Sequence, residues 1–159
     1  MCPEIVWRWS RFAELTPNAL YSALRARCEV FVVEQRCAFL DLDGADQEAL
    51  HLLGWTQGGG GSVLAAYLRL LPPGCRFAEP SIGRVLTTTA FRRTGAGHAL
   101  VREGVRKCTQ MYPHRGIRIG AQRYLEKFYG EFGFMPSSGP YIEDAIAHIE
   151  MVRPADATL

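Results

Sequence analysis

The chain has 159 residues, of which 48% are hydrophobic and 21% charged, and its formal net charge is +2. This composition is typical of a globular protein, excludes a disordered one, and gives no basis for bulk nucleic-acid or membrane binding. No apolar run approaches the roughly 20 residues that span a bilayer, and the first ten residues lack the apolar core of a signal peptide. We therefore expect one domain over residues 1–159, located in the cytoplasm, with no nucleic-acid and no membrane partner.

The five cysteines are widely spaced, and the sequence contains no C-x-x-C pair. Structural zinc sites draw on close pairs of cysteine and histidine, so this spacing predicts no metal site. We expect reduced thiols that are buried or half-buried. The five are Cys2, Cys28, Cys37, Cys75 and Cys108.

The first third of the chain predicts a strand, a helix and a loop. The aromatic-rich stretch 4–10 alternates as a strand does. Thr16-Pro17 is a helix start signal, and the apolar face that follows runs to about Gln35. The acidic segment CAFLDLDGADQEA comes next, and the spacing around Gly44 does not fit an EF-hand calcium loop. We expect this segment to be a solvated loop.

A hairpin and a phosphate-binding type of turn occupy the middle of the chain. Residues 49–56 and 62–71 predict two strands joined by the flexible sequence QGGGGS. The stretch from Ile82 to Val105 then predicts a strand, the turn RRTGAG and an amphipathic helix over 98–111. Such a turn presents free backbone N–H groups and the positive end of a helix dipole, which favour an anion and phosphate above all.

Two common nucleotide-binding patterns do not fit this turn. A Walker A loop requires Lys-Ser/Thr after its last glycine, where His98 and Ala99 stand, and a dinucleotide fingerprint requires a third glycine, where Leu100 stands. On these residues alone, a turn that only caps the helix is an equal alternative.

The remaining segments complete an alternating order of strands and helices. Residues 117–121 predict a short strand, and Leu125, Phe128, Tyr129 and Phe132 lie on one face of a helix that ends at Gly133. A last strand is expected over 145–152. The order β-α-β-β-β-α-β-α-β predicts an α/β or α+β fold with a mixed sheet.

Several of these motifs together resemble the GNAT superfamily of N-acetyltransferases. They are Arg92-x-x-Gly95-x-Gly97 after a hydrophobic strand, and the later helix that reads F-Y-x-x-x-G-F over 128–134. The segments VFVVEQ, IGRV, GAQ and YIEDAIAHIEM resemble the bacterial ElaA-type subfamily. The resemblance covers essentially the whole chain and implies a mostly antiparallel sheet of six or seven strands flanked by about four helices.

The resemblance implies that acetyl-coenzyme A is the co-substrate and that no metal takes part. Its pyrophosphate would lie on the N–H groups of the glycine turn, and its pantetheine arm would pair with the strand before it. A free N–H at Leu86 or a neighbour would meet the thioester carbonyl. Relatives usually have glycine at position 93 and at position 145, where this chain has Arg93 and Ala145. The implied cofactor-binding residues are Val85, Leu86, Thr87, Arg92, Arg93, Thr94, Gly95, Ala96, Gly97, His98 and Gln122.

The resemblance also implies candidate catalytic residues. Tyr129 occupies the position of the family's general acid, which protonates the departing thiolate; the alternative is that Tyr129 only belongs to its apolar helix face. The candidates for the base or amine ligand are Glu34, Glu143, Asp144 and His148. For His148, as for His51, the apolar neighbours in the sequence favour a structural role, and a base acting through water is a further alternative.

We therefore predict an N-acetyltransferase in which a primary amine attacks the thioester of acetyl-coenzyme A directly. The acceptor is a small-molecule amine or a protein amine, and the acidic candidates would suit a cationic one. The alternative is a non-catalytic module of the same fold that senses acyl-CoA or binds a partner, whereas the failed fingerprints disfavour a nucleotide-binding domain. The resemblance allows a homodimer, because many relatives pair through their sheet edges.

Overall fold

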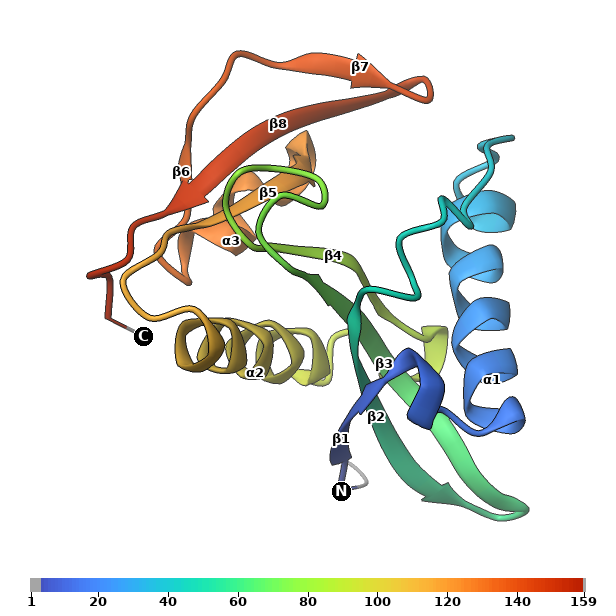
Figure 1. The fold of residues 1–159 in the computed structure, drawn as a ribbon. Helices are drawn as coiled ribbons and strands as arrows, with labels where there is room; N and C mark the ends of the chain where they lie inside the picture. The colour runs from blue at the N-terminus through green and yellow to red at the C-terminus, as the bar shows by residue number, and fades with distance from the viewer. Residues whose placement is uncertain (1–3, 159) are drawn as a thin grey trace.

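The computed structural model describes residues 4–158 and contains two antiparallel sheets of four strands each (Figure 1). The first sheet contains, in order across it, β1 (Val6–Arg11), β2 (Leu50–Gly58), β3 (Gly61–Leu71) and β4 (Ser81–Thr87). In the second sheet β8 pairs with each of the other strands. Its members are β5 (Ile117–Gln122), β6 (Met135–Pro136), β7 (Tyr141–Glu143) and β8 (Ile146–Arg153).

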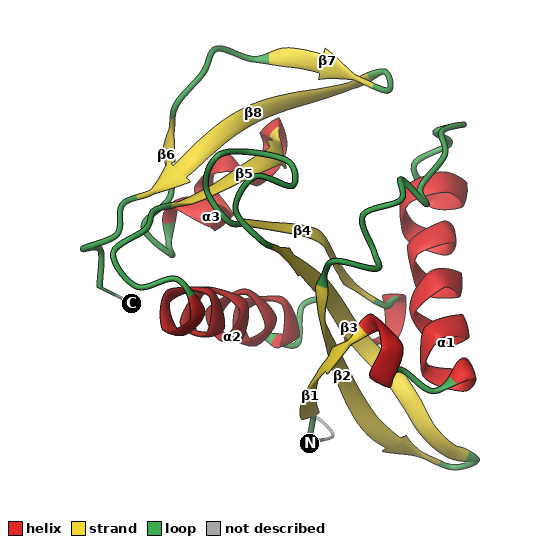
Figure 2. Cartoon of the chain, viewed as in Figure 1, coloured by secondary structure: helices red, strands yellow, loops and turns green. Residues whose placement is uncertain are grey.

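Three α-helices accompany the two sheets in the described part of the chain (Figure 2). They are α1 (Pro17–Arg27), α2 (Ala96–Met111) and α3 (Glu126–Gly130). α1 begins as predicted, because the Thr16 hydroxyl accepts a hydrogen bond from the Ala19 N–H at 3.2 Å and proline holds the first helical position. The helix continues as a π-helix over Cys28–Glu34.

Helices α1 and α2 cover opposite faces of the first sheet. Alternate side chains of a strand point to opposite faces. Leu52 and Leu68 therefore pack with the buried face of α2, and their neighbours Leu53 and Tyr67 pack with α1. Both strands are buried on both sides, so their sequences read as nearly continuous apolar runs.

The two sheets meet where β4 and β5 begin, and they separate from there (Figure 1). The Arg118 N–H donates to the Pro80 carbonyl at 3.1 Å, but the two strands belong to different sheets. β4 also contains a bulge opposite β3, where Arg84 takes a φ of +52°. The backbone edges of β4 and β5 therefore face an opening between the two sheets.

The predicted fold class is confirmed, although several element boundaries were wrong. The structure has eight strands where six or seven were expected, and three α-helices where about four were expected. β2 and β3 extend through most of QGGGGS and leave only a tight turn at residues 59–60. The helix expected up to Gly133 is a five-residue α3 preceded by a 3-10 turn, and β6 and β7 were not predicted.

The described cysteines agree with the predicted burial in three of four cases. Cys37 and Cys108 are buried and Cys75 is half-buried, but Cys28 is exposed at the start of the π-helix. Cys2 lies outside the described residues. Over residues 4–158, no group of three or more His, Cys, Asp or Glu side chains could hold a metal ion, and no helix there is long and apolar enough to cross a membrane.

Candidate active site

A cleft of about 680 Å³ occupies the opening between the two sheets. Its walls come from β4, β5, the π-helix after α1, α3 and the hairpin of β7 and β8. Ten of the predicted site residues line it: Glu34, Val85, Leu86, Thr87, Arg92, Gln122, Tyr129, Glu143, Asp144 and His148. The rest of the predicted phosphate loop, 93–98, lies outside the cleft lining at the start of α2.

The turn before α2 is shaped to leave backbone N–H groups free. Gly95 is the N-cap of α2 and has a φ of +88°, a conformation that favours glycine. The Thr94 hydroxyl donates to the Phe91 carbonyl at 2.7 Å and holds the turn in place. Within residues 4–158, no acceptor is found for the N–H groups of Gly97 and His98. These free N–H groups lie at the positive end of a 16-residue helix, a position that favours an anion.

At two positions where relatives usually have glycine, this chain has another residue but keeps the left-handed backbone conformation that favours glycine. Arg93 has a φ of +61° and Ala145 has a φ of +63°. A residue with a side chain is disfavoured in this left-handed region by roughly 1–2 kcal/mol. The turn geometry is thus retained here at a conformational cost.

We predict that the two glycines of this turn respond differently to alanine. At Gly95 a Cβ meets no atom within 4 Å, so Gly95→Ala should destabilise the protein by about 1 kcal/mol through its positive φ alone. At Gly97 a Cβ makes only ordinary contacts at 3.9 Å with Phe128 and Thr87, so Gly97→Ala should leave stability unchanged or raise it. Urea unfolding of both variants measures this, and equal losses in the two would contradict it.

The edge of β4 has free backbone groups where the pantetheine arm was predicted. Backbone N–H and C=O groups of successive residues point to opposite edges of a strand. The Thr88 N–H donates to Ala65 of β3, and the Thr87 carbonyl accepts from the Arg92 side chain at 3.4 Å. By this alternation the N–H group of Thr87 faces the cleft, whereas that of Leu86 faces β3.

Tyr129 lies on α3 with its ring in the core and its hydroxyl on the cleft. The side chain is 7% exposed and packs edge-on against Phe128 and Phe134. Burial raises the pKa of the phenol well above its ordinary value. Within the described residues its hydroxyl has no hydrogen-bond partner, so it is free to meet a ligand as a protonated donor.

The candidate bases differ in the hydrogen bonds that they already form within the protein. Glu34 accepts a hydrogen bond from Arg92 at 2.6 Å. The Nδ1–H group of His148 donates a hydrogen bond to the carbonyl of Ile146 at 2.8 Å. Its Nε2 therefore carries the lone pair in the neutral ring and lies 3.9 Å from the Glu143 carboxylate. The geometry favours His148 over Glu34 as a proton acceptor.

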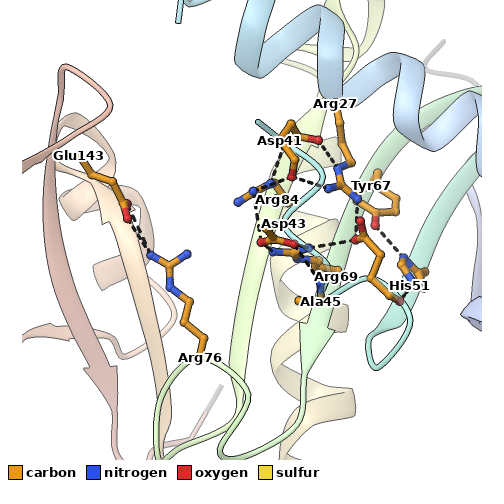
Figure 3. A network of polar contacts seen from close by, with 11 residues as sticks. Arg27, Asp41, Asp43, Ala45, His51, Tyr67, Arg69, Arg76, Arg84 and Glu143 are labelled. Atoms are coloured by element: carbon orange, nitrogen blue, oxygen red, sulfur yellow. Dashed lines mark hydrogen bonds and ion pairs between the residues drawn. The ribbon is translucent and has the colours of Figure 1, made fainter. Parts of the chain in front are cut away.

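The acidic segment is a loop, as predicted, and Asp43 and Glu48 are exposed, but the prediction that the loop is solvated was wrong for two of its aspartates. Asp41 and Asp46 are 3% and 6% exposed. Figure 3 shows Asp41 between Arg27 of α1 and Arg84 of β4. Asp46 accepts hydrogen bonds from Arg27 and from Arg69 of β3. The charges of the arginines compensate those of the aspartates, which is what allows both to be buried.

This buried network ties the acidic segment to three elements of the fold. Arg27 of α1 donates to Asp41 at 2.8 Å and to Asp46 at 2.7 Å. Arg69 of β3 donates to Asp46 at 2.9 Å and forms an ion pair with Asp43. Arg84, at the bulge of β4, donates to Asp41 at 2.7 Å. The bulge beside the cleft is therefore held by the network.

Two further predicted residues have partners inside the protein. His51 is 1% exposed and bonds the Tyr67 hydroxyl at 2.7 Å and the Asp46 carbonyl at 2.9 Å, which confirms its structural role. Gln122 donates to the Gln35 side chain at 3.1 Å, so binding a pantetheine amide would require it to share or leave that partner.

The chain is similar to known proteins over nearly its whole length. Residues 74–154 match the family described as an acetyltransferase (GNAT) domain. A UPF0039 protein of Synechocystis is 44% identical over 149 residues, which cover 94% of this chain and 95% of that protein. Protein ElaA of Escherichia coli is 38% identical over 151 residues, covering 94% and 96%.

Two solved structures of similar sequence also have a similar fold. The crystal structure of Escherichia coli ElaA superposes with a TM-score of 0.86 at 38% identity and covers 94% of this chain and 99% of that one. An acyl-CoA N-acyltransferase from Pseudomonas aeruginosa has a TM-score of 0.86 at 37% identity, with the same coverage.

Proposed function

The chain belongs to the GNAT family of acetyltransferases, with ElaA among its relatives, and we propose that it transfers an acetyl group from acetyl-coenzyme A to a primary amine. The observation that carries this proposal is one continuous arrangement. It comprises the free edge of β4 and the protonated Tyr129 hydroxyl, which line the cleft, and the turn with free N–H groups, which follows Arg92 at the start of α2.

Binding of the co-substrate is supported by the donors that this chain offers. The N–H groups of Gly97 and His98 would hold the pyrophosphate at the positive end of α2. The edge of β4 would pair with the pantetheine arm, and the N–H of Thr87 would donate to the thioester oxygen. An N–H in that role contributes of order 3 kcal/mol by comparison with other oxyanion holes.

The proposed chemistry uses two side chains of the cleft. The acceptor nitrogen loses a proton to His148 Nε2, directly or through water, and forms a bond to the carbonyl carbon while the carbon–sulfur bond breaks. Tyr129 gives its proton to the departing sulfur. The products are the N-acetylated amine and free coenzyme A.

Calorimetry and a turnover assay test the proposal together. We expect acetyl-coenzyme A and coenzyme A to bind with micromolar dissociation constants, and we expect thiol release in the presence of an amine panel. Binding without turnover on a broad panel would support a non-catalytic acyl-CoA sensor instead. Failure to bind either compound would contradict the proposed function.

A further inference from the structure

Arg76 holds the loosest ion pair among the arginines of the cleft. Its Nη2 lies 3.4 and 3.5 Å from the two carboxylate oxygens of Glu143, beyond the usual length of a charge-assisted hydrogen bond. Arg69, Arg84 and Arg92 each hold a carboxylate oxygen at 2.9 Å or less. Arg76 is therefore the cleft arginine that can change its partner with the smallest loss.

The guanidinium of Arg76 is nevertheless oriented by its neighbours. It lies over the ring of Phe77 at 5.3 Å from the ring centre. A Cβ added to Gly120 of β5 would come within 3.2 Å of both the Arg76 Nη2 and the Tyr141 hydroxyl, so the missing side chain makes room for these two groups. A planar guanidinium fixed in this way suits a carboxylate, which it can bind with two parallel hydrogen bonds.

Glu143 is the carboxylate that faces Arg76 in the cleft. Figure 3 shows Glu143 reaching from β7 toward Arg76, which stands on the loop after β3. Glu34 and Asp43 are already paired with Arg92 and Arg69, so they offer little attraction to an added cation. A ligand carboxylate on Arg76 would release Glu143 beside His148, where its charge would favour an ammonium group.

From this arrangement we propose that the acceptor is an amine that also carries a carboxylate, and that this carboxylate takes the place of Glu143 on Arg76. The inference rests on the proposed N-acetyltransferase function. Arg76 is then the residue that determines acceptor specificity, while Glu143 and His148 receive the amino group.

A panel of matched acceptors tests the inference. Glycine, L-leucine, L-phenylalanine, β-alanine and 4-aminobutyrate are each compared with their carboxamides, which keep the amine and remove the negative charge. Binding is measured by calorimetry with coenzyme A present, and kcat/KM with acetyl-coenzyme A. We expect the best carboxylate to exceed its carboxamide about 10- to 100-fold in both, and Arg76→Gln to abolish that difference.

Arg118→Gln is the matched control. Arg118 also lies over the Phe77 ring, at 5.8 Å from the ring centre, but it pairs with Glu79 and Glu150 and does not line the cleft. This variant should keep the preference for carboxylates. Carboxylates that bind no better than carboxamides, or that do not bind at all, would overturn the inference.

The two readouts separate this inference from the proposed function. Carboxylate-selective binding without acetyl transfer would contradict the function and support the role of Arg76. Acetyl transfer with no difference between acids and amides, or a difference that survives Arg76→Gln, would support the function and overturn the role of Arg76.

Discussion

Replacing Tyr129 with phenylalanine should lower kcat about 100-fold or more and leave the dissociation constant of acetyl-coenzyme A unchanged. The substitution removes only the hydroxyl, and that hydroxyl is the proton donor proposed for the departing sulfur. The ring keeps its packing against Phe128 and Phe134. Stopped assays of thiol release and calorimetry with coenzyme A measure the two quantities.

The fold should tolerate this change. Within the described residues the Tyr129 hydroxyl has no hydrogen-bond partner, so its removal leaves no buried polar group unpaired. We expect the free energy of unfolding to change by no more than about 0.5 kcal/mol. Tyr124→Phe is the control, because Tyr124 lines the same cleft but is 75% exposed. An equal loss of kcat in both variants, or none in Tyr129→Phe at any pH, would disprove the assigned acid.

The direction of the Tyr129 pKa shift also fixes the shape of the pH profile. Burial raises this pKa above the ordinary value near 10, so the phenol remains protonated as the pH rises through the range in which amines lose their protons. The native enzyme should therefore gain activity with rising pH and show no decline before about pH 10.

The parts of the fold and of the site that could be predicted are those that depend on a few neighbouring residues in the sequence. Thr16-Pro17 starts α1 because a cap needs only residues within one helical turn. The turn before α2 could be predicted from the spacing of Gly95 and Gly97, since glycine spacing directly constrains the backbone. Tyr129 was proposed from a motif of only a few residues, and the structure places this residue in the lining of the cleft.

The buried arginine–aspartate network could not be predicted from the acidic segment alone. Asp41 and Asp46 sit in a sequence whose local composition is that of an exposed loop. Their partners Arg27, Arg69 and Arg84 lie 14 to 43 residues away and come from three different elements. A signal was nevertheless present, because a charged residue inside an apolar strand requires a compensating partner.

Short elements were missed for a related reason. β6 has two residues and β7 has three, which is too short for an alternating pattern to appear. They form only because β8 offers its edge to both. The Arg76–Glu143 pair depends on β7, so the acceptor side of the cleft was the part that the sequence described least.

Replacing Asp46 with alanine should lower the free energy of unfolding by about 3–5 kcal/mol. The carboxylate accepts hydrogen bonds from both Arg27 and Arg69, and its removal leaves two buried guanidinium groups without that charge. The melting temperature should fall by roughly 6–20 °C. Glu29→Ala is the control, because the Arg25–Glu29 pair is exposed and should contribute about 0.5 kcal/mol or less. Equal losses in the two variants would contradict the role of the network.

Acid should act on the same network in two steps. Hydrogen bonds and charge from Arg69 lower the pKa of Asp43, and Arg27 and Arg69 outweigh burial to lower that of Asp46. As the pH falls, these carboxylates therefore take up protons in the unfolded chain before they do so in the folded one. The free energy that their ion pairs contribute to folding is present above about pH 4 and is lost as the pH falls further. Burial lowers the pKa of His51, so a smaller loss should begin below about pH 6.5.

Urea unfolding between pH 3 and 8 measures both steps. Asp46→Asn keeps an oxygen acceptor but no charge, and should weaken the lower step. The upper step should persist or grow, because the charge of Asp46 raises the pKa of His51 against the effect of burial. An unchanged lower step in this variant would show that the network does not set the acid stability.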